Sequence, residues 1–427
     1  MIASMIGISL LLLLFLGIPV FACLALVGGS ALLYLQGELG PVSEFVFHDI
    51  SRYVLVTIPL FAYMAHIMIR SRIVDDLYET AYVLTRHLPG GLAIATVGAC
   101  TLFAAISGSS VATALTVGAV AIPQMIRFGY APRLAYGLVA AGGTLGILIP
   151  PSGPMVLFGV ITNTSIAGLF MAGIIPGLLM GLVFIGWSMW SNVRGATPVR
   201  REPRASVSET LAALRKAAWA FALPMVVLIG MYCGVFTATE AAAIGAMLAT
   251  LVGIVVYRNV SLKTIFESAA DAAKTSGMLF MVVGGAAIFA YVLTKLHIPQ
   301  QLVDWITRMD IGVYGFLILL MVVLFLLGVF LESVALILVT TPVVLPVLQY
   351  LHIDPIWYGV LLVIKLELAL IMPPMGMNLF TIKSITSASL SEITRGAIPY
   401  AFLMLFMLAL VMVFPQIALW LPSQLIR

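Results

Sequence analysis

Long runs of apolar residues, separated by short polar stretches, follow one another along the chain from residue 4 to residue 422. A membrane-spanning helix needs about 20 consecutive apolar residues, whereas a strand of a membrane barrel alternates over about 10 residues. The runs here are continuous, so they predict helices. The first run, residues 2–36, is too long for one span, and Gly17-Ile18-Pro19 in its middle predicts two helices joined by a tight turn.

The polar stretches that follow differ in pattern. Residues 36–51 carry three acidic residues and are predicted to form a loop. Between residues 70 and 87, apolar side chains recur at helical spacing among arginines, which predicts a helix lying along the membrane surface. These apolar residues are Ile73, Leu77, Ala81 and Leu84.

Composition agrees with an integral membrane protein and excludes several functional classes. Of the 427 residues, 62% are hydrophobic and 9% are charged, against about 25% charged residues in soluble domains. No stretch is basic and aromatic enough to predict nucleic-acid binding. The histidines are scattered and the cysteines lie in apolar runs, so neither predicts a metal site. Without a Ser-His-Asp constellation, P-loop or dinucleotide fingerprint, the sequence predicts neither an enzyme nor an organic cofactor.

Poor helix-forming residues interrupt two apolar runs that are hydrophobic enough to lie in a membrane. The first interruption is the hydroxyl cluster Ser107-Gly108-Ser109-Ser110, and the second is Pro150-Pro151. Irregular backbone at membrane depth survives only where it is buried in protein or lines a cavity, because unpaired amides and carbonyls are costly in lipid. Broken segments of this kind are pointers to a transport site.

The first interruption predicts a re-entrant hairpin over residues 90–127. Each arm is too short to span comfortably, and arginines flank both ends, at Arg86 and at Arg127 and Arg133. By the positive-inside rule, both ends then face the cytoplasm. Residues 134–160 follow as a helix broken at the proline pair.

The second half of the chain repeats the first. Ser333 matches Ser110 at an offset of 223 residues (333 − 110 = 223), and the same offset recurs over several further positions. Repetition at a fixed period indicates a duplicated structural unit. The further matching pairs are Pro123 with Pro346, Pro150-Pro151 with Pro373-Pro374, Gly153 with Gly376, Gly173 with Gly396, and Pro176 with Pro399.

The duplication predicts the domain organisation. A first repeat covers residues 1–190, an arginine-rich cytoplasmic linker covers 191–216, and a second repeat covers 217–427. The second repeat should hold a hairpin at about 312–350 and a broken helix at about 356–382. With about five crossings each, an odd number, the repeats must be inverted. The expected fold is an all-α polytopic membrane protein of the elevator type.

Two inverted hairpins, each beside a broken helix, favour an alternating-access carrier. A break exposes carbonyl oxygens on one half-helix, which suit a small hard cation, and amide donors on the other, which suit an anion. This pattern predicts a cation-coupled carrier of an anionic solute. A channel would need rings of like groups around an axis, which the sequence lacks. An intramembrane enzyme would need a nucleophile with a nearby base.

The motifs at the two breaks resemble a known family. Residues 142–152, Gly-Gly-Thr-Leu-Gly-Ile-Leu-Ile-Pro-Pro-Ser, and residues 373–380, Pro-Pro-Met-Gly-Met-Asn-Leu-Phe, are similar to the large membrane subunit of tripartite ATP-independent periplasmic (TRAP) transporters. The resemblance implies sodium-driven uptake of an organic acid, such as a C4-dicarboxylate or a sialic acid, across a bacterial inner membrane. It also implies a soluble periplasmic binding protein and a small four-helix membrane subunit. That subunit is expected as a separate chain, because the repeat begins almost at Met1.

The resemblance also implies two sodium ions, one in each repeat. The first would be bound by Ser107, Gly146, Ile149 and Pro151, and the second by Gly328, Ala369, Met372 and Met375. The second break reads Ile371-Met372-Pro373-Pro374 where the family pattern is Ile-Thr-Pro-Pro, so a hydroxyl ligand is missing there. The residues expected to bind substrate are Ser109, Ser110, Thr144, Glu332, Ser333 and Asn378.

Ionisable residues inside apolar runs are functional candidates. Glu332, at the second tip, is expected to shape substrate or cation binding. Lys365 and Glu367 precede the second break. They are either functional residues, a mutually paired structural couple, or side chains that snorkel from a helix end. Glu240 follows Thr237-Ala238-Thr239 and is expected to cap a helix.

One alternative from the residues is a single-component dicarboxylate carrier, coupled to sodium or to protons. In the proton-coupled case Glu332 or Glu367 would carry the proton. Neighbouring genes for a binding protein and a four-span protein would favour the tripartite system.

Overall fold

The computed structural model describes residues 2–73, 75–193, 202–328, 331–373 and 376–424. Within these ranges the regular structure is entirely helical, which confirms the all-α prediction. In chain order the helices are α1 (Ile2–Phe15), α2 (Val20–Gln36), α3 (Gly40–Ile50), a 3-10 helix (Tyr53–Val56), α4 (Thr57–Arg70), α5 (Asp75–Thr85), α6 (Gly91–Ser107), α7 (Ser110–Arg127), α8 (Pro132–Leu148), α9 (Gly153–Thr162), α10 (Ile166–Val193), α11 (Val207–Tyr232), α12 (Ala238–Val255), α13 (Leu262–Lys295), α14 (Ile298–Arg308), α15 (Val313–Leu327), α16 (Ser333–Tyr350), α17 (Pro355–Ile371), α18 (Met377–Ile385), α19 (Leu390–Val413) and α20 (Gln416–Ser423).

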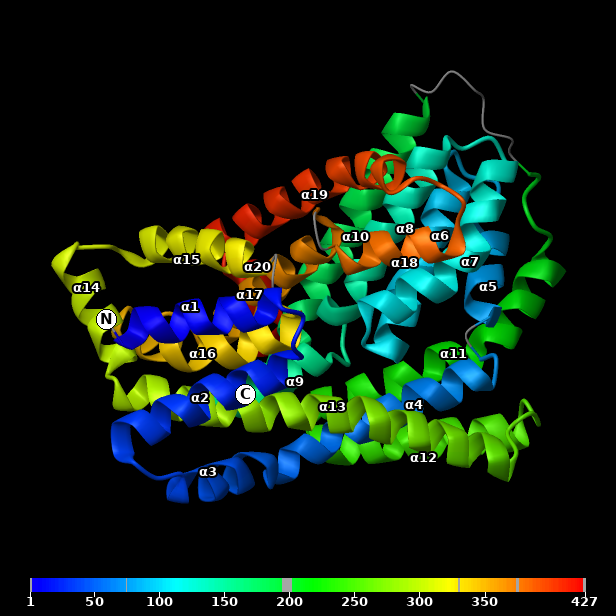
Figure 1. Cartoon of the computed structure of the whole chain (residues 1–427). Helices are drawn as coiled ribbons and strands as arrows, with labels where there is room; N and C mark the ends of the chain where they lie inside the picture. The colour runs from blue at the N-terminus through cyan, green and yellow to red at the C-terminus, as the bar shows by residue number, and fades with distance from the viewer. Residues whose placement is uncertain (1, 74, 194–201, 329–330, 374–375, 425–427) are drawn as a thin grey trace.

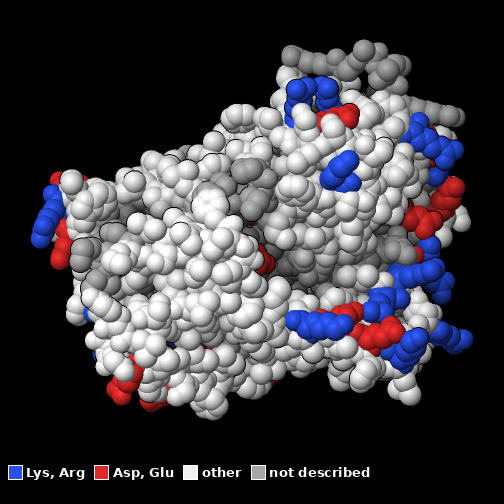
Figure 2. All heavy atoms as spheres, viewed as in Figure 1, with Lys and Arg blue, Asp and Glu red and all other residues white. Residues whose placement is uncertain are grey.

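The molecule has the surface of a multi-pass membrane protein. Among the described residues, nine helical segments are long and apolar enough to cross a bilayer. Figure 2 shows Lys, Arg, Asp and Glu side chains gathered toward two opposite ends of the visible face, with a broad and mostly uncharged belt between them. Such a belt is what a protein exposes to lipid, where charged groups are costly.

The helices divide into two groups. Helix α4 packs against both α12 and the long helix α13, and α2 and α3 pack against α13 (Figure 1). The second group centres on α8, which contacts α6, α7, α10, α17 and α19. Almost every residue of α8 from Leu134 to Leu148 is buried, so this helix forms the core of the second group.

Helix bounds repeat at the spacing found in the sequence. Helices α7 and α16 start 223 residues apart and end 223 residues apart, and so do α8 and α17. The hairpin arms α6 and α7 fall within the range predicted for the first hairpin, and α15 and α16 within that of the second. Both breaks, between α8 and α9 and between α17 and α18, follow at the prolines. The duplicated sequence thus produces duplicated local structure.

Two stretches differ from the sequence prediction. The predicted loop at residues 36–51 contains helix α3, which packs against α13. The predicted linker at residues 191–216 becomes helical again at Val207, because Ser206 and Glu209 form a reciprocal capping box that starts α11. Helix α3 depends on its packing against α13 and the start of α11 depends on its capping box, and an apolar run reveals neither.

The predicted surface helix is α5, and it is more enclosed than expected. Ile73 and Leu77 are fully buried, whereas Leu84 remains exposed. Helix α5 packs against α6 and α11, so its apolar face is covered by protein and not only by the bilayer.

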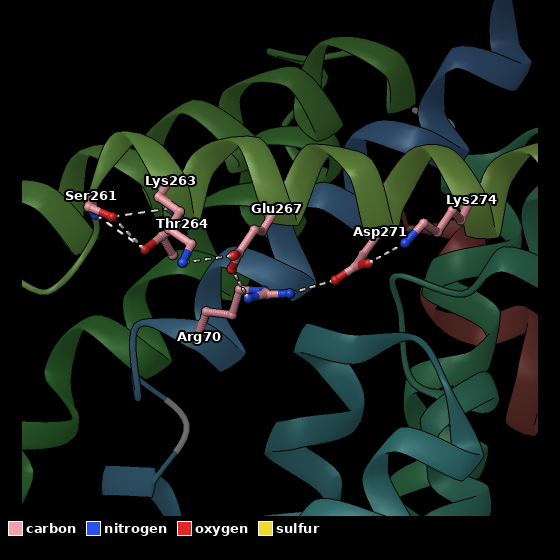
Figure 3. Close-up of polar contacts among 7 residues, drawn as sticks. All are labelled: Arg70, Ser261, Lys263, Thr264, Glu267, Asp271 and Lys274. Atoms are coloured by element: carbon pink, nitrogen blue, oxygen red, sulfur yellow. Dashed lines mark hydrogen bonds and ion pairs between the residues drawn. The ribbon is translucent and has the colours of Figure 1, made fainter.

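A charged network joins α4 to α13 at one end of the molecule (Figure 3). The Arg70 guanidinium lies 2.6 Å from Glu267 and 2.6 Å from Asp271. Lys274 and Lys263 extend the network along α13, at 3.5 Å from Asp271 and 3.9 Å from Glu267. Exposed pairs of this kind contribute little individually, but a network fixes the relative position of the two helices.

Candidate functional site

The tip of the first hairpin is a compact cluster of hydroxyl groups. Helix α6 ends at Ser107, Gly108 takes a left-handed conformation with φ of 57°, and Ser109 caps α7. The Ser107 hydroxyl lies 3.1 Å from the Thr113 hydroxyl and donates to the Ser109 carbonyl at 3.3 Å. Thr113, which is fully buried, donates to the same carbonyl at 2.7 Å. Two side-chain hydroxyls therefore converge on one carbonyl oxygen.

This tip lies directly against the break of α8. A methyl group added at Gly146 would lie 2.7 Å from the Ser109 carbonyl oxygen, and one added at Gly108 would lie 2.6 Å from the Pro151 carbonyl oxygen. The glycines are therefore needed for the backbones to approach so closely. Helix α8 ends at Leu148, so the carbonyls that follow lack the continuing helix that would pair them.

The residues predicted for the first sodium ion are thus largely brought together. Ser107, Gly146 and Pro151 lie within one cluster of carbonyl and hydroxyl oxygens. Ile149 is the C-cap of α8, and its side chain packs against Gly177 of α10, so only its backbone can contribute. Oxygen ligands from carbonyls and hydroxyls are the chemistry that a small hard cation requires.

A lysine ammonium lies at the tip of the second hairpin, where the first hairpin has hydroxyl groups. Gly328 and Ala369, both predicted for the second sodium ion, lie close together, and the ammonium of Lys365 lies directly against Gly328. A methyl group at Gly328 would lie 2.5 Å from Lys365 Nζ and 3.4 Å from Ala369 Cβ. Met372 is the C-cap of α17, and Met375 lies outside the described residues.

The predicted substrate-binding residues fall into two sets. Ser110, Thr144 and Asn378 are buried: the Ser110 hydroxyl donates to the Thr144 carbonyl at 3.4 Å, and Asn378 Nδ2 donates to the Ala140 carbonyl at 3.0 Å. The Asn378 Oδ1 atom is buried without a hydrogen-bond partner among the described residues. Ser109 and Ser333 are half-buried and Glu332 is exposed, so these three can meet a solute.

The pairing of Lys365 with Glu367 is wrong as a structural hypothesis. Lys365 Nζ donates instead to the carbonyl of Leu324 on α15. Glu367 is fully buried, and neither of its carboxyl oxygens has a hydrogen-bond partner among the described residues. Residues two positions apart on a helix point to different faces, which is why the two do not meet.

Two features of the site escaped sequence reasoning. Thr113 was not singled out, although it lies four residues after Ser109, the spacing at which a hydroxyl donates back to a helix carbonyl. The Lys365 contact depends on the packing of α15 against α17, which no local pattern encodes. Glu240, by contrast, caps α12 with Thr237 as predicted.

Helical hairpins packed on broken helices, within a multi-pass bundle, define a membrane transporter by fold. A solved structure of similar shape is the Alcanivorax borkumensis YdaH transporter, with a TM-score of 0.66 over 90% of this chain and 88% of that chain. The two sequences are 12% identical, so this likeness concerns the fold alone.

The chain belongs to the TRAP transporter large permease family. Residues 8–417 match the family model described as the tripartite ATP-independent periplasmic transporter, DctM component. This membership confirms the resemblance of the motifs and the predicted location as a multi-pass protein of the bacterial inner membrane.

Three relatives show the range of the family. The C4-dicarboxylate large permease DctM of Pseudomonas aeruginosa is 38% identical over 92% of each chain. The ectoine/5-hydroxyectoine large permease UehC of Ruegeria pomeroyi is 33% identical over 98% of each chain. The isethionate permease DctMQ of Oleidesulfovibrio alaskensis is 33% identical over 89% of this chain and 60% of its own length.

Proposed function

We propose that this large permease takes up an organic acid together with sodium, by alternating access between the two sides of the membrane. The observation that carries the proposal is the contact between the first hairpin tip and the first break. There the Ser109 carbonyl lies beside Gly146 and the Pro151 carbonyl lies beside Gly108. The Ser107 and Thr113 hydroxyls both contact the Ser109 carbonyl. These neutral oxygens can bind a sodium ion without an acidic ligand.

The breaks also favour an anionic solute. Helices α9 and α18 begin just after the two breaks, and the partial positive charge at the start of a helix favours a bound carboxylate. Ser109, Ser333 and Glu332 are the predicted side chains that are not buried. The named substrates of the relatives include C4-dicarboxylates and isethionate, which are anions, and this supports an organic acid here.

Two further proteins complete the proposed system. The relative DctMQ is longer than this chain, which spans 60% of it, consistent with a small subunit fused to a large one. For the present chain we infer a small four-helix membrane subunit and a periplasmic binding protein that delivers the substrate. We infer that the chain's role is transport, as it is for its named relatives.

The experiment is uptake of a radiolabelled organic acid into proteoliposomes, with and without each partner. Uptake should require the binding protein, the small subunit and an inward sodium gradient. Uptake by the large permease alone would favour the single-component carrier. Uptake driven by a proton gradient at zero sodium would favour the proton-coupled alternative and exclude sodium coupling.

A further inference from the structure

A lysine ammonium is enclosed in the second half-site. Lys365 lies in the middle of α17 and is 1% exposed. Its Nζ atom donates to the carbonyl of Leu324, which also accepts from the Gly328 amide at 2.9 Å. The ring centroid of Phe325 lies 5.9 Å away, within the range of a cation–π contact. The ammonium is therefore held at the end of α15, beside the second hairpin tip.

This position is one that would otherwise favour a cation. The last carbonyls of α15 lack helical partners, and the C-terminal end of a helix carries partial negative charge. At the second break, the Leu370 and Met372 carbonyls both point toward Gly376, where an added methyl group would lie 2.9 Å from each oxygen. A positive charge nearby offsets this concentration of carbonyl oxygens.

The first half-site has no such group. The residue 223 positions before Lys365 is Gly142, whose neighbour is the Cys100 thiol. The first tip instead carries the Ser107 and Thr113 hydroxyls, whereas the residue 223 positions after Thr113 is Leu336. The second break has Met372 where the family pattern has a threonine. The first half-site thus offers hydroxyl ligands to a mobile ion, and the second half-site instead holds an ammonium beside its backbone carbonyls.

The surroundings leave the ammonium few other contacts. Lys365 lines a groove of about 740 Å³ together with Phe325, Leu368 and Met372, and the rest of that lining is apolar. Glu367, the nearest acid along α17, makes no ion pair with it among the described residues. The Leu324 carbonyl and the Phe325 ring therefore hold the charge in place.

We propose that Lys365 is a tethered cation that replaces the second sodium ion, so that the second half-site binds none. Two like charges a few ångströms apart repel, and a sodium ion beside Gly328 and Ala369 would meet the ammonium directly. Transport by this protein is then coupled to sodium at the first half-site alone. This inference rests on the sodium coupling proposed above and specifies its stoichiometry.

The test is the sodium dependence of uptake by the reconstituted complex of both membrane subunits and the binding protein. The wild-type protein should show a Hill coefficient of about 1 for sodium, since the coefficient cannot exceed the number of sites. Lys365→Met should lose most uptake at low sodium. The double variant Lys365→Met/Met372→Thr should recover uptake with a Hill coefficient of about 2, because it restores a hydroxyl and removes the charge.

A matched control is Lys383→Met. The Lys383 ammonium also donates to a carbonyl, that of Ala388 at 2.8 Å, but its residue is exposed on α18. Its sodium dependence should equal that of the wild type. If Lys365→Met does not fold, two other measurements test the proposal. The sodium-to-substrate flux ratio of the wild type, measured with radioactive sodium, should reflect one sodium site. The Lys365→Arg variant keeps the charge and should keep the sodium dependence of the wild type.

The outcomes separate this inference from the proposed function. If sodium dependence is cooperative in the wild type and Lys365→Met does not change it, the tethered cation is overturned and sodium coupling still stands. Uptake that ignores sodium in every variant would overturn sodium coupling itself. Cooperativity that appears only in the double variant is the result that the tethered cation predicts.

Discussion

At the scale of single residues, the first half-site forms where a hydroxyl, a glycine and a proline interrupt apolar runs. Ser107, Gly146 and Pro151 stand out in the sequence for that reason, and they lie together in the structure. Lys365 also stands out as a charge, but its partner could not be predicted. Leu324 contributes a backbone carbonyl, and any residue type provides one.

Gly146→Ala should reduce sodium-dependent uptake by about tenfold or more, equivalent to about 1.4 kcal/mol, because the added methyl group pushes the Ser109 carbonyl away. Gly186→Ala is the matched control, since nothing lies within 4 Å of an added methyl group on that residue of α10. The measurement is initial uptake rate per correctly folded complex. Equal losses in both variants would contradict a role for the close approach.

Glu367→Gln should leave the melting temperature unchanged or raise it, while lowering uptake. A buried carboxyl without hydrogen-bond partners destabilises a fold, so removing its charge costs nothing in stability. Such a group is retained for function when stability does not require it. Thermal unfolding of the purified complex and uptake are measured side by side. A large drop in melting temperature with proportionate loss of uptake would show a structural role instead.

At the scale of elements, helix types and most helix positions followed from the apolar pattern. The repeat of helix bounds between α7 and α16, and between α8 and α17, reflects the sequence offset residue for residue. Helix α3 and the start of α11 were missed because they depend on packing against α13 and on a capping box, and not on apolar length. Local polar patterns of this kind are weaker signals than long apolar runs.

Asp354→Ala should destabilise α17 by about 1 kcal/mol, the usual cost of losing an N-cap. The Asp354 carboxylate accepts from the amides of Ile356 at 2.7 Å and Trp357 at 3.3 Å, at the start of the helix that carries Lys365. A lowered thermal midpoint of the purified complex is the expected result. Asp304→Ala, at an exposed acid inside α14, serves as the control. Identical midpoints for the two variants would show that the cap is dispensable.

At the scale of the whole molecule, the two groups of helices carry different features of the protein. The group of α4, α12 and α13 is fixed at one end by the Arg70 network, and the first half-site belongs to the group around α8. The second hairpin joins the two groups, because α15 packs against α17 and α16 packs against α13. Composition and apolar runs predicted a polytopic transporter. They could not predict this arrangement, because it depends on which apolar helix faces pack against one another. Apolar faces that contact protein and apolar faces that contact lipid have similar sequences.

We propose that the oxygens at the first hairpin tip and at the break after α8 bind the sodium ion that drives uptake. The most direct measurement is uptake against sodium concentration at fixed pH, for wild-type and Ser107→Ala complexes. Wild-type uptake should vanish without sodium. Ser107→Ala should need about tenfold more sodium for half-maximal uptake, the change expected for a loss of about 1.4 kcal/mol in binding. Uptake that persists without sodium, or identical sodium curves for the two proteins, would contradict the account.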